Sequence, residues 1–170
     1  MSEQIKIDLK ITNAELIKAI ISFTDEQFNK IPFGGSWTGG QTAEHIAISD
    51  TGTTKIINDK TAKTERDPEK NIEVLKNVML DMGNKMKNPD FNTPSNGTHD
   101  KAKLVAQIQN IEEKQLEAIE RLDLTEACVS FPLPSMGNLT RIEWLHFNMY
   151  HKQRHTNQLK NILEKLSEKQ

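Results

Sequence analysis

The stretch that decides the fold is residues 140–166, TRIEWLHFNMYHKQRHTNQLKNILEKL. Thr140 followed by Glu143 matches the S/T-x-x-E capping box, in which two side chains satisfy free backbone N–H groups at the start of a helix. From Arg141 the chain runs almost to its end without a proline or a glycine, so nothing interrupts that helix. The sequence therefore predicts one long helix from Arg141 nearly to the C-terminus, against which other helices pack.

Apolar residues recur at helical spacing in other stretches as well. The predicted helices run from Thr12 or Asn13 to about Ser22, from Gln41 or Thr42 past Ile57, from Pro68 to about Lys87, and from about Asp100 to about Leu122, with a short piece capped by Thr24. Segments 31–40, 88–100 and 128–140 are rich in residues that break helices and are predicted loops. An alternating, strand-like pattern extends no further than QIKIDLKI at 4–11. The predicted class is all-α, in a single domain over 1–170.

Charge and composition exclude several classes of function. The 22 basic and 24 acidic residues leave a net charge of −2, so no overall field draws the chain to nucleic acid or to an anionic membrane. No stretch approaches the ~18 apolar residues of a membrane span, and the N-terminus lacks the apolar core of a signal peptide. Cys128 is the single cysteine, which fits a reducing compartment. We therefore expect a cytoplasmic protein without nucleic-acid or membrane partners.

Three histidines stand out by their placement. His151 and His155 are four residues apart, so they differ by about 40° around the helix and can point at one ion. Large apolar residues bracket them on the same strip, which indicates that they face inward and need polar partners. His45 shares its face with apolar residues of another predicted helix. Either the three are core histidines bonded to backbone carbonyls, or they hold a metal ion.

The other two histidines are left out of this site. His146 lies about 140° around the helix from His151, so it is interpreted as structural. His99 ends a polar loop and is interpreted as a solvated residue or a helix-start feature.

Two segments, GGSWTGGQTAEHI (34–46) and GNLTRIEWLHFNMYHKQRHTNQL (137–159), resemble those of the DinB-like (DinB/YfiT) superfamily. The shared marks are a tryptophan shortly before a helix whose first turn or two holds one histidine, and a closing H-x-x-x-H followed by an amide residue and aliphatics. The resemblance implies a four-helix bundle in an up-down-down-up arrangement, with an additional helix in a long connection. It also implies a divalent metal, zinc or nickel first, held by His45, His151 and His155, with open positions filled by water.

Characterised members of that superfamily include thiol-S-transferases that use low-molecular-weight thiols, isomerases and putative hydrolases, so the resemblance implies an enzyme acting on a small molecule. A three-imidazole site with an open position suits such chemistry, because the ion can lower the pKa of bound water to about 7 or ionise a thiol. A zincin is excluded, because HKQRH at 151–155 lacks the glutamate of H-E-x-x-H. The alternative is a non-catalytic bundle, with or without metal, that acts through association.

Several residues are candidates for a supporting role. Asn148, Gln158, Glu44 and Asp50 could orient an imidazole or hold a water, although each also fits an ordinary surface or core position. Trp37 is interpreted as a loop anchor or as a wall of the site entrance. Cys128 is interpreted as a buried small hydrophobe rather than a nucleophile. Small helical bundles often pair through an exposed face, which allows a homodimer.

Overall fold

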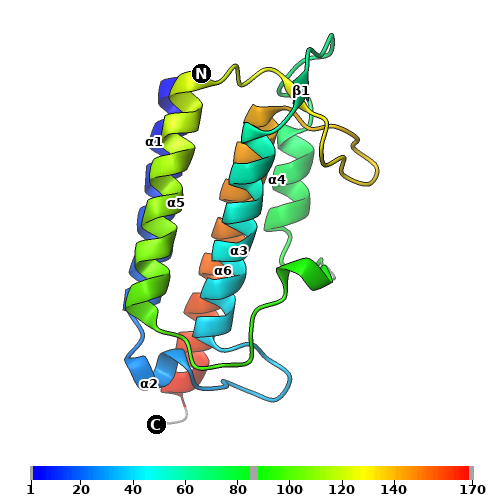
Figure 1. Cartoon of the computed structure of the whole chain (residues 1–170). Helices are drawn as coiled ribbons and strands as arrows, with labels where there is room; N and C mark the ends of the chain where they lie inside the picture. The colour runs from blue at the N-terminus through cyan, green and yellow to red at the C-terminus, as the bar shows by residue number, and fades with distance from the viewer. Residues whose placement is uncertain (1, 85–87, 169–170) are drawn as a thin grey trace.

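The computed structural model describes residues 2–84 and 88–168, and most of these residues are helical (Figure 1). Its elements, in chain order, are α1 Ser2–Ile21, α2 Asp25–Phe28, α3 Gly39–Asn58, β1 Thr61–Ala62, α4 Ile72–Leu80, a 3-10 turn η1 Asp90–Asn92, α5 Lys101–Arg121, β2 Ala127–Cys128 and α6 Arg141–Ser167. The predicted all-α class is confirmed, and the capping box of Thr140 and Glu143 is formed at the start of α6.

The four long helices α1, α3, α5 and α6 form the bundle. Helices α1 and α3 occupy opposite corners, and each packs against both α5 and α6. In Figure 1, α1 and α6 run down while α3 and α5 run up, which is the expected up-down-down-up order. The parallel pair α3 and α5 requires a long connection, and this connection carries α4, which packs on the outside of α6. The four-helix bundle with an additional helix is confirmed.

The first helix begins about ten residues earlier than predicted. Ile5 and Leu9, one turn apart, are buried in α1, whereas Ile7 and Ile11 are 49% and 59% exposed. The short alternation at 4–11 therefore satisfies a helical stripe as well as a strand, and the bundle selects the helix because it can bury only that stripe. Asn13 does not cap the helix, because it lies inside the bundle and its Oδ1 accepts from Lys152 Nζ.

Helix α4, over Ile72–Leu80, is shorter than the helix predicted from Pro68 to Lys87. It begins at Ile72, where Glu143 on α6 accepts the backbone N–H of Asn71. It ends at Leu80, where the Arg154 guanidinium donates to the backbone oxygens of Met79, Asp81 and Asn84. These bonds satisfy carbonyls that a longer helix would have satisfied itself. The predicted end at Lys87 falls outside the described residues.

A two-residue antiparallel pair, β1 with β2, was not predicted. It joins the segment after α3 to the segment before α6, where a loop was predicted from Cys128 onward. Within residues 2–84 and 88–168, no helix combines the length and apolar character needed to cross a bilayer.

A layer of buried polar side chains divides the core into two apolar clusters. One cluster includes Leu9, Ile57 and Met149, and the other includes Leu16, Ala47 and Leu159. Between them, Lys152 Nζ lies 3.0 Å from Asp50 Oδ2, and both side chains are fully buried. The hydrogen bonds of this layer reach all four long helices through Asn13, Asp50, Thr54, Gln115, Asn148 and Lys152.

The first prediction concerns this ion pair. Lys152→Met leaves the Asp50 carboxylate buried without its cation, so we expect the free energy of unfolding to fall by about 3–5 kcal/mol. The double variant Asp50→Leu, Lys152→Met removes both charges and should recover much of that loss. Urea unfolding of both variants at pH 7 measures the two changes. A double variant as unstable as the single one would show that the layer stabilises through more than the pairing of its charges.

Candidate metal centre

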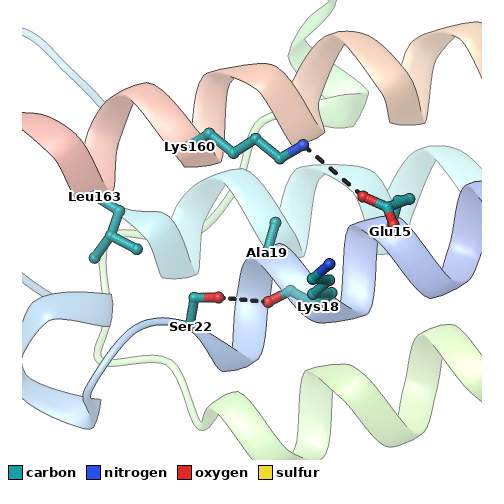
Figure 2. Close-up of a pocket in the computed structure, with 6 residues that line it drawn as sticks. All are labelled: Glu15, Lys18, Ala19, Ser22, Lys160 and Leu163. Carbon is teal, nitrogen blue, oxygen red and sulfur yellow. Dashed lines mark hydrogen bonds and ion pairs between the residues drawn. The ribbon is translucent and has the colours of Figure 1, made fainter.

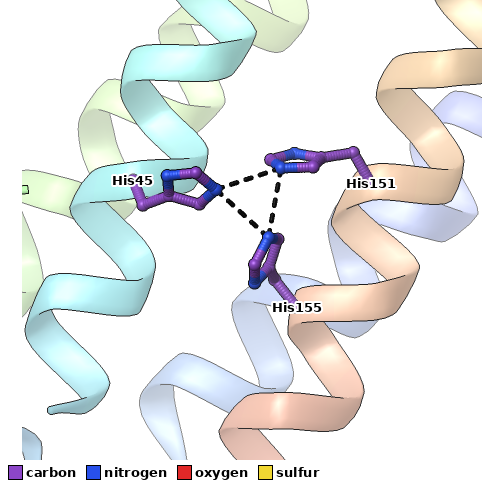
Figure 3. A group of neighbouring side chains, drawn as sticks. All are labelled: His45, His151 and His155. Atoms are coloured by element: carbon purple, nitrogen blue, oxygen red, sulfur yellow. Dashed lines mark hydrogen bonds between the residues drawn. The ribbon is translucent and has the colours of Figure 1, made fainter. Parts of the chain in front are cut away.

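Two helices bring three histidines together. His45 lies in the second turn of α3, whose start is fixed by a capping box of Thr38 and Gln41. His151 and His155 lie on successive turns of α6, and their rings point toward that of His45 (Figure 3). The three Nε2 atoms form a nearly equilateral triangle, with 3.0 Å from His45 to His151, 3.1 Å from His45 to His155, and 3.1 Å from His151 to His155.

The outer nitrogens of the rings fix which tautomers are present. His45 Nδ1 donates to the backbone oxygen of Asn92 at 2.8 Å, and His155 Nδ1 donates to Gln158 Oε1 at 2.7 Å. An imidazole that carries its proton on Nδ1 presents a lone pair at Nε2. At least two lone pairs therefore converge on the centre of the triangle. His151 Nδ1 is buried and has no hydrogen-bond partner among the described residues.

The environment keeps the rings uncharged at neutral pH. Burial, with a smaller effect of nearby His45, lowers the pKa of His155 from 6.5 to about 4. Burial and the two neighbouring histidines lower the pKa of His151 well below 6.5. Burial also lowers the pKa of His45, although its hydrogen bond to Asn92 opposes that shift. Neutral imidazole is the form that binds metals.

The triangle matches a divalent ion in size and chemistry. At a metal–nitrogen distance of about 2.0–2.1 Å, these spacings correspond to N–metal–N angles of about 95–100°, between octahedral and tetrahedral values. Among the described residues, the three histidines form a group whose ligand atoms all lie within 4.8 Å of one another. No cysteine or carboxylate belongs to this group, so the donor set is three neutral nitrogens.

A segment that we call the strap, residues 88–100, covers one side of this centre. Its Asn92 carbonyl holds His45. Farther along the strap, Glu44 Oε2 accepts from the Ser95 backbone N–H at 2.6 Å and lies 2.9 Å from His99 Nε2. Of the two interpretations of His99, the solvated one is wrong, because this residue is 8% exposed and its contact with Glu44 docks the strap onto α3. His99 does stand at a helix start, directly before Asp100, the N-cap of α5. A backbone carbonyl such as that of Asn92 carries no signal in side-chain identity, so sequence reasoning could not find it.

Of the four candidates for a supporting role, the structure places only Gln158 against an imidazole of the triangle. Glu44 is adjacent to His45 in sequence but points at the strap. Asp50 pairs with Lys152 in the polar layer. Asn148 donates to Asp50 and accepts from Gln115. Among the described residues these three make no hydrogen bond to His45, His151 or His155; Glu44 docks the strap, and Asp50 and Asn148 pair within the polar layer.

The remaining predicted features lie as follows. The ring centroid of Trp37 lies 5.0 Å from that of His45, which places this tryptophan beside the site. The His146 ring lies 5.7 Å from that of Tyr150, beside a groove between α1 and α6 and away from the triangle. Cys128 is buried, and burial raises the pKa of its thiol to about 11, as expected for a hydrophobe rather than a nucleophile.

A second shallow groove on the α1–α6 seam, shown in Figure 2, has a volume of about 160 Å³ and also lies away from the triangle.

Comparison with known proteins decides the family. The sequence profile of the DinB superfamily matches residues 8–159. The chain belongs to the DinB superfamily. The matched range of this DinB-superfamily chain includes all three histidines of the triangle.

One relative and one solved structure extend this result. The uncharacterized protein YuaE of Bacillus subtilis (strain 168) is 26% identical over 145 residues, which are 84% of this chain and 87% of the relative. The crystal structure of TT2238, a four-helix bundle protein, superimposes with a TM-score of 0.59 at 17% identity and covers 95% of this chain and 99% of that one. The structural likeness supports the four-helix-bundle fold.

The second prediction tests the docking of the strap. A Cβ at Gly40 would lie 2.6 Å from the Cβ of His99, so Gly40→Ala should displace His99 and lower the free energy of unfolding by about 1–3 kcal/mol. Gly52→Ala on the same helix is the matched control, since nothing lies within 4 Å of its added Cβ. This control should stabilise α3 by about 0.5–1 kcal/mol. Urea unfolding measures both changes, and equal shifts of the same sign would contradict this packing.

The third prediction follows from the lowered pKa of His155. Between pH 6.5 and about 4, the unfolded chain protonates this imidazole and the folded chain does not, so stability falls as the pH falls through this window. His155 alone accounts for up to roughly 3 kcal/mol of this loss. In urea unfolding with a chelator, His155→Gln should lose less stability than the wild type between pH 6.5 and 4.5. Equal losses in both proteins would show that this imidazole is not held neutral.

Proposed function

We propose that this chain binds one divalent ion of a first-row metal through Nε2 of His45, His151 and His155, and that it is a metal-dependent transferase or hydrolase acting on a small molecule. The observation that carries the proposal is the convergence of the three Nε2 atoms at 3.0–3.1 Å, with two of the rings fixed in the Nδ1–H tautomer. Without a cation, lone pairs at this distance would repel one another.

The donor set favours a reactive centre over a closed one. Three neutral ligands leave a divalent ion its full charge and at least one exchangeable position, the composition of catalytic zinc sites. Zinc and nickel are the first choices, because imidazole suits both. When bound, the ion would act as a Lewis acid and lower the pKa of a coordinated water or thiol, which suits hydrolysis and transfer to a low-molecular-weight thiol.

The chain's own residues orient the ligands and limit access of water. The Asn92 carbonyl and Gln158 hold the outer ring nitrogens of His45 and His155. Trp37 and Phe147 lie against His45 and His151. The carboxylates nearest in sequence are engaged by other groups, Glu44 by the strap and Asp50 by Lys152. No protein carboxylate is therefore proposed as a general base, and a peptidase is not proposed.

The proposed compartment is the cytoplasm, because the single Cys128 can form no intramolecular disulfide and is buried. A small-molecule substrate and a homodimer belong to the same proposal, and sedimentation of the purified protein measures the second.

The fourth prediction is that protein purified without an affinity tag contains about one zinc or nickel ion per chain, measured by inductively coupled plasma mass spectrometry. The double variant His151→Ala, His155→Ala should lose the ion, because one imidazole does not hold it. His146→Ala, on the same helix but outside the triangle, is the matched control and should keep it.

Two results would contradict the metal proposal. One is a wild type that takes up no ion even after incubation with zinc or nickel, which would leave the association of a metal-free bundle as the better account. The other is an ion that persists in the double variant. Once the ion is established, assays with an activated ester and with an electrophile plus a thiol separate hydrolase from transferase.

A further inference from the structure

A row of aromatic rings leads from the surface to the triangle of histidines. Phe91 in η1 lies 6.2 Å from Phe131, measured between ring centroids, and Phe131 lies 5.9 Å from Trp144 on α6. Trp144 lies 5.3 Å from Phe147, and the Phe147 ring is parallel to that of His151 within 4° at 6.2 Å. The row therefore ends on one of the proposed metal ligands.

Exposure along this row differs from that of a core cluster. Phe91 is 70% exposed and Phe131 is 39% exposed, whereas Trp144 and His151 are buried. Core packing explains the inner rings but not the exposed surface of the outer two, because apolar area left in water gains no free energy from burial. Contiguous exposed apolar groups on a soluble protein mark binding sites more often than single ones do.

Two buried polar atoms near the row lack partners. Trp144 Nε1 and Asn92 Oδ1 make no hydrogen bond within the described part of the chain. Trp144 belongs to the row itself, and Asn92 follows Phe91 and holds His45 through its carbonyl. Buried polar atoms are almost always bonded to protein or to water, so this donor and this acceptor are available to a water molecule or to a group bound at the row.

The charges around the triangle indicate which ligand the inner end of the row would favour. The donor set is neutral, and the two nearby carboxylates are engaged elsewhere by the strap and by Lys152. A bound divalent ion would keep its positive charge and attract an anionic oxygen or sulfur donor. The inner end of the row thus favours an anion, and its outer rings favour a flat apolar group.

We infer that Phe91, Phe131 and Phe147, with the buried Trp144 packed behind them, bind the aromatic part of a small substrate whose anionic oxygen or sulfur donor reaches the metal. This inference rests on the proposed function, since it places the donor on the ion. Edge-to-face and offset contacts with successive rings would hold the aromatic part. The continuity of the row with His151 favours a small molecule over a second copy of this chain, which would cover the outer rings alone.

The fifth prediction compares two hydroxamates that differ in their apolar group. Calorimetric titration of the zinc-loaded protein should show benzohydroxamate binding at least about tenfold more tightly than acetohydroxamate, as expected for several ring contacts. Phe91→Ala and Phe131→Ala change exposed residues and should fold normally, and each should reduce this ratio to about threefold or less. Phe33→Ala, which removes a phenylalanine that is 54% exposed and lies outside the row, should leave it unchanged.

The possible outcomes distinguish a failure of this inference from a failure of the metal proposal. Zinc content is measured in each protein, so a lost ratio is attributed to the row only where the ion is retained. Equal affinity for the two hydroxamates, or a ratio that survives both row variants, overturns the inference and leaves the metal proposal standing. If the zinc-loaded protein binds neither compound, the metal has no exchangeable coordination position, and both that part of the proposed function and this inference are wrong. A wild-type dimer that Phe91→Ala converts to a monomer in sedimentation assigns the outer rings to a second copy, and that also overturns it.

Discussion

The buried contact between Lys152 and Asp50 fixes how α6 sits against α3. An ammonium group without exposure must keep its partners, so the Lys152 side chain has to reach Asp50 on α3 and Asn13 on α1 at the same time. A shift of α6 by one residue would move it about 1.5 Å along its axis and turn it by about 100°, and would break both contacts. Lys152 follows His151 directly in sequence, so the rotation that buries this lysine also sets the direction of His151 and, three residues later, of His155. The geometry of the triangle therefore depends on this polar layer. None of the hydrogen bonds described for the layer involves an imidazole of the triangle.

Much of this architecture could be predicted from sequence because it depends on local rules. The capping box at Thr140 and the lack of breakers in α6 are read directly from the chain, and an H-x-x-x-H on a helix places two imidazoles together by geometry alone. What could not be predicted depends on partners far away in sequence. The stripe of Ile5 and Leu9 becomes helical because a bundle exists to bury it, and α4 ends where a guanidinium from α6 reaches its last carbonyls. Glu44 and Asp50 were plausible partners of the triangle by position, but His99 and Lys152, distant in sequence, engage them.

Without a metal ion, the triangle of histidines lowers the stability of the folded protein. Burying three imidazoles removes them from water and brings their nitrogens within 3.0–3.1 Å of one another, an arrangement that burial alone would not favour. The rest of the bundle, with its two apolar clusters, has to supply the stability that holds the rings in place. Sites prepared in this way bind a ligand with little reorganisation, because the surrounding fold has already ordered the groups that contact it.

The hydrogen bond from His45 Nδ1 to the Asn92 carbonyl has a thermodynamic consequence. It connects a ring that faces the triangle to a strap whose other anchors are Glu44 and Asn29. If a ligand that touches the strap changes the affinity of the triangle for an ion, the ion must change the affinity for that ligand by the same factor. Occupancy of the triangle and binding of that ligand would then share one coupling free energy, so that each raises or lowers the affinity for the other equally.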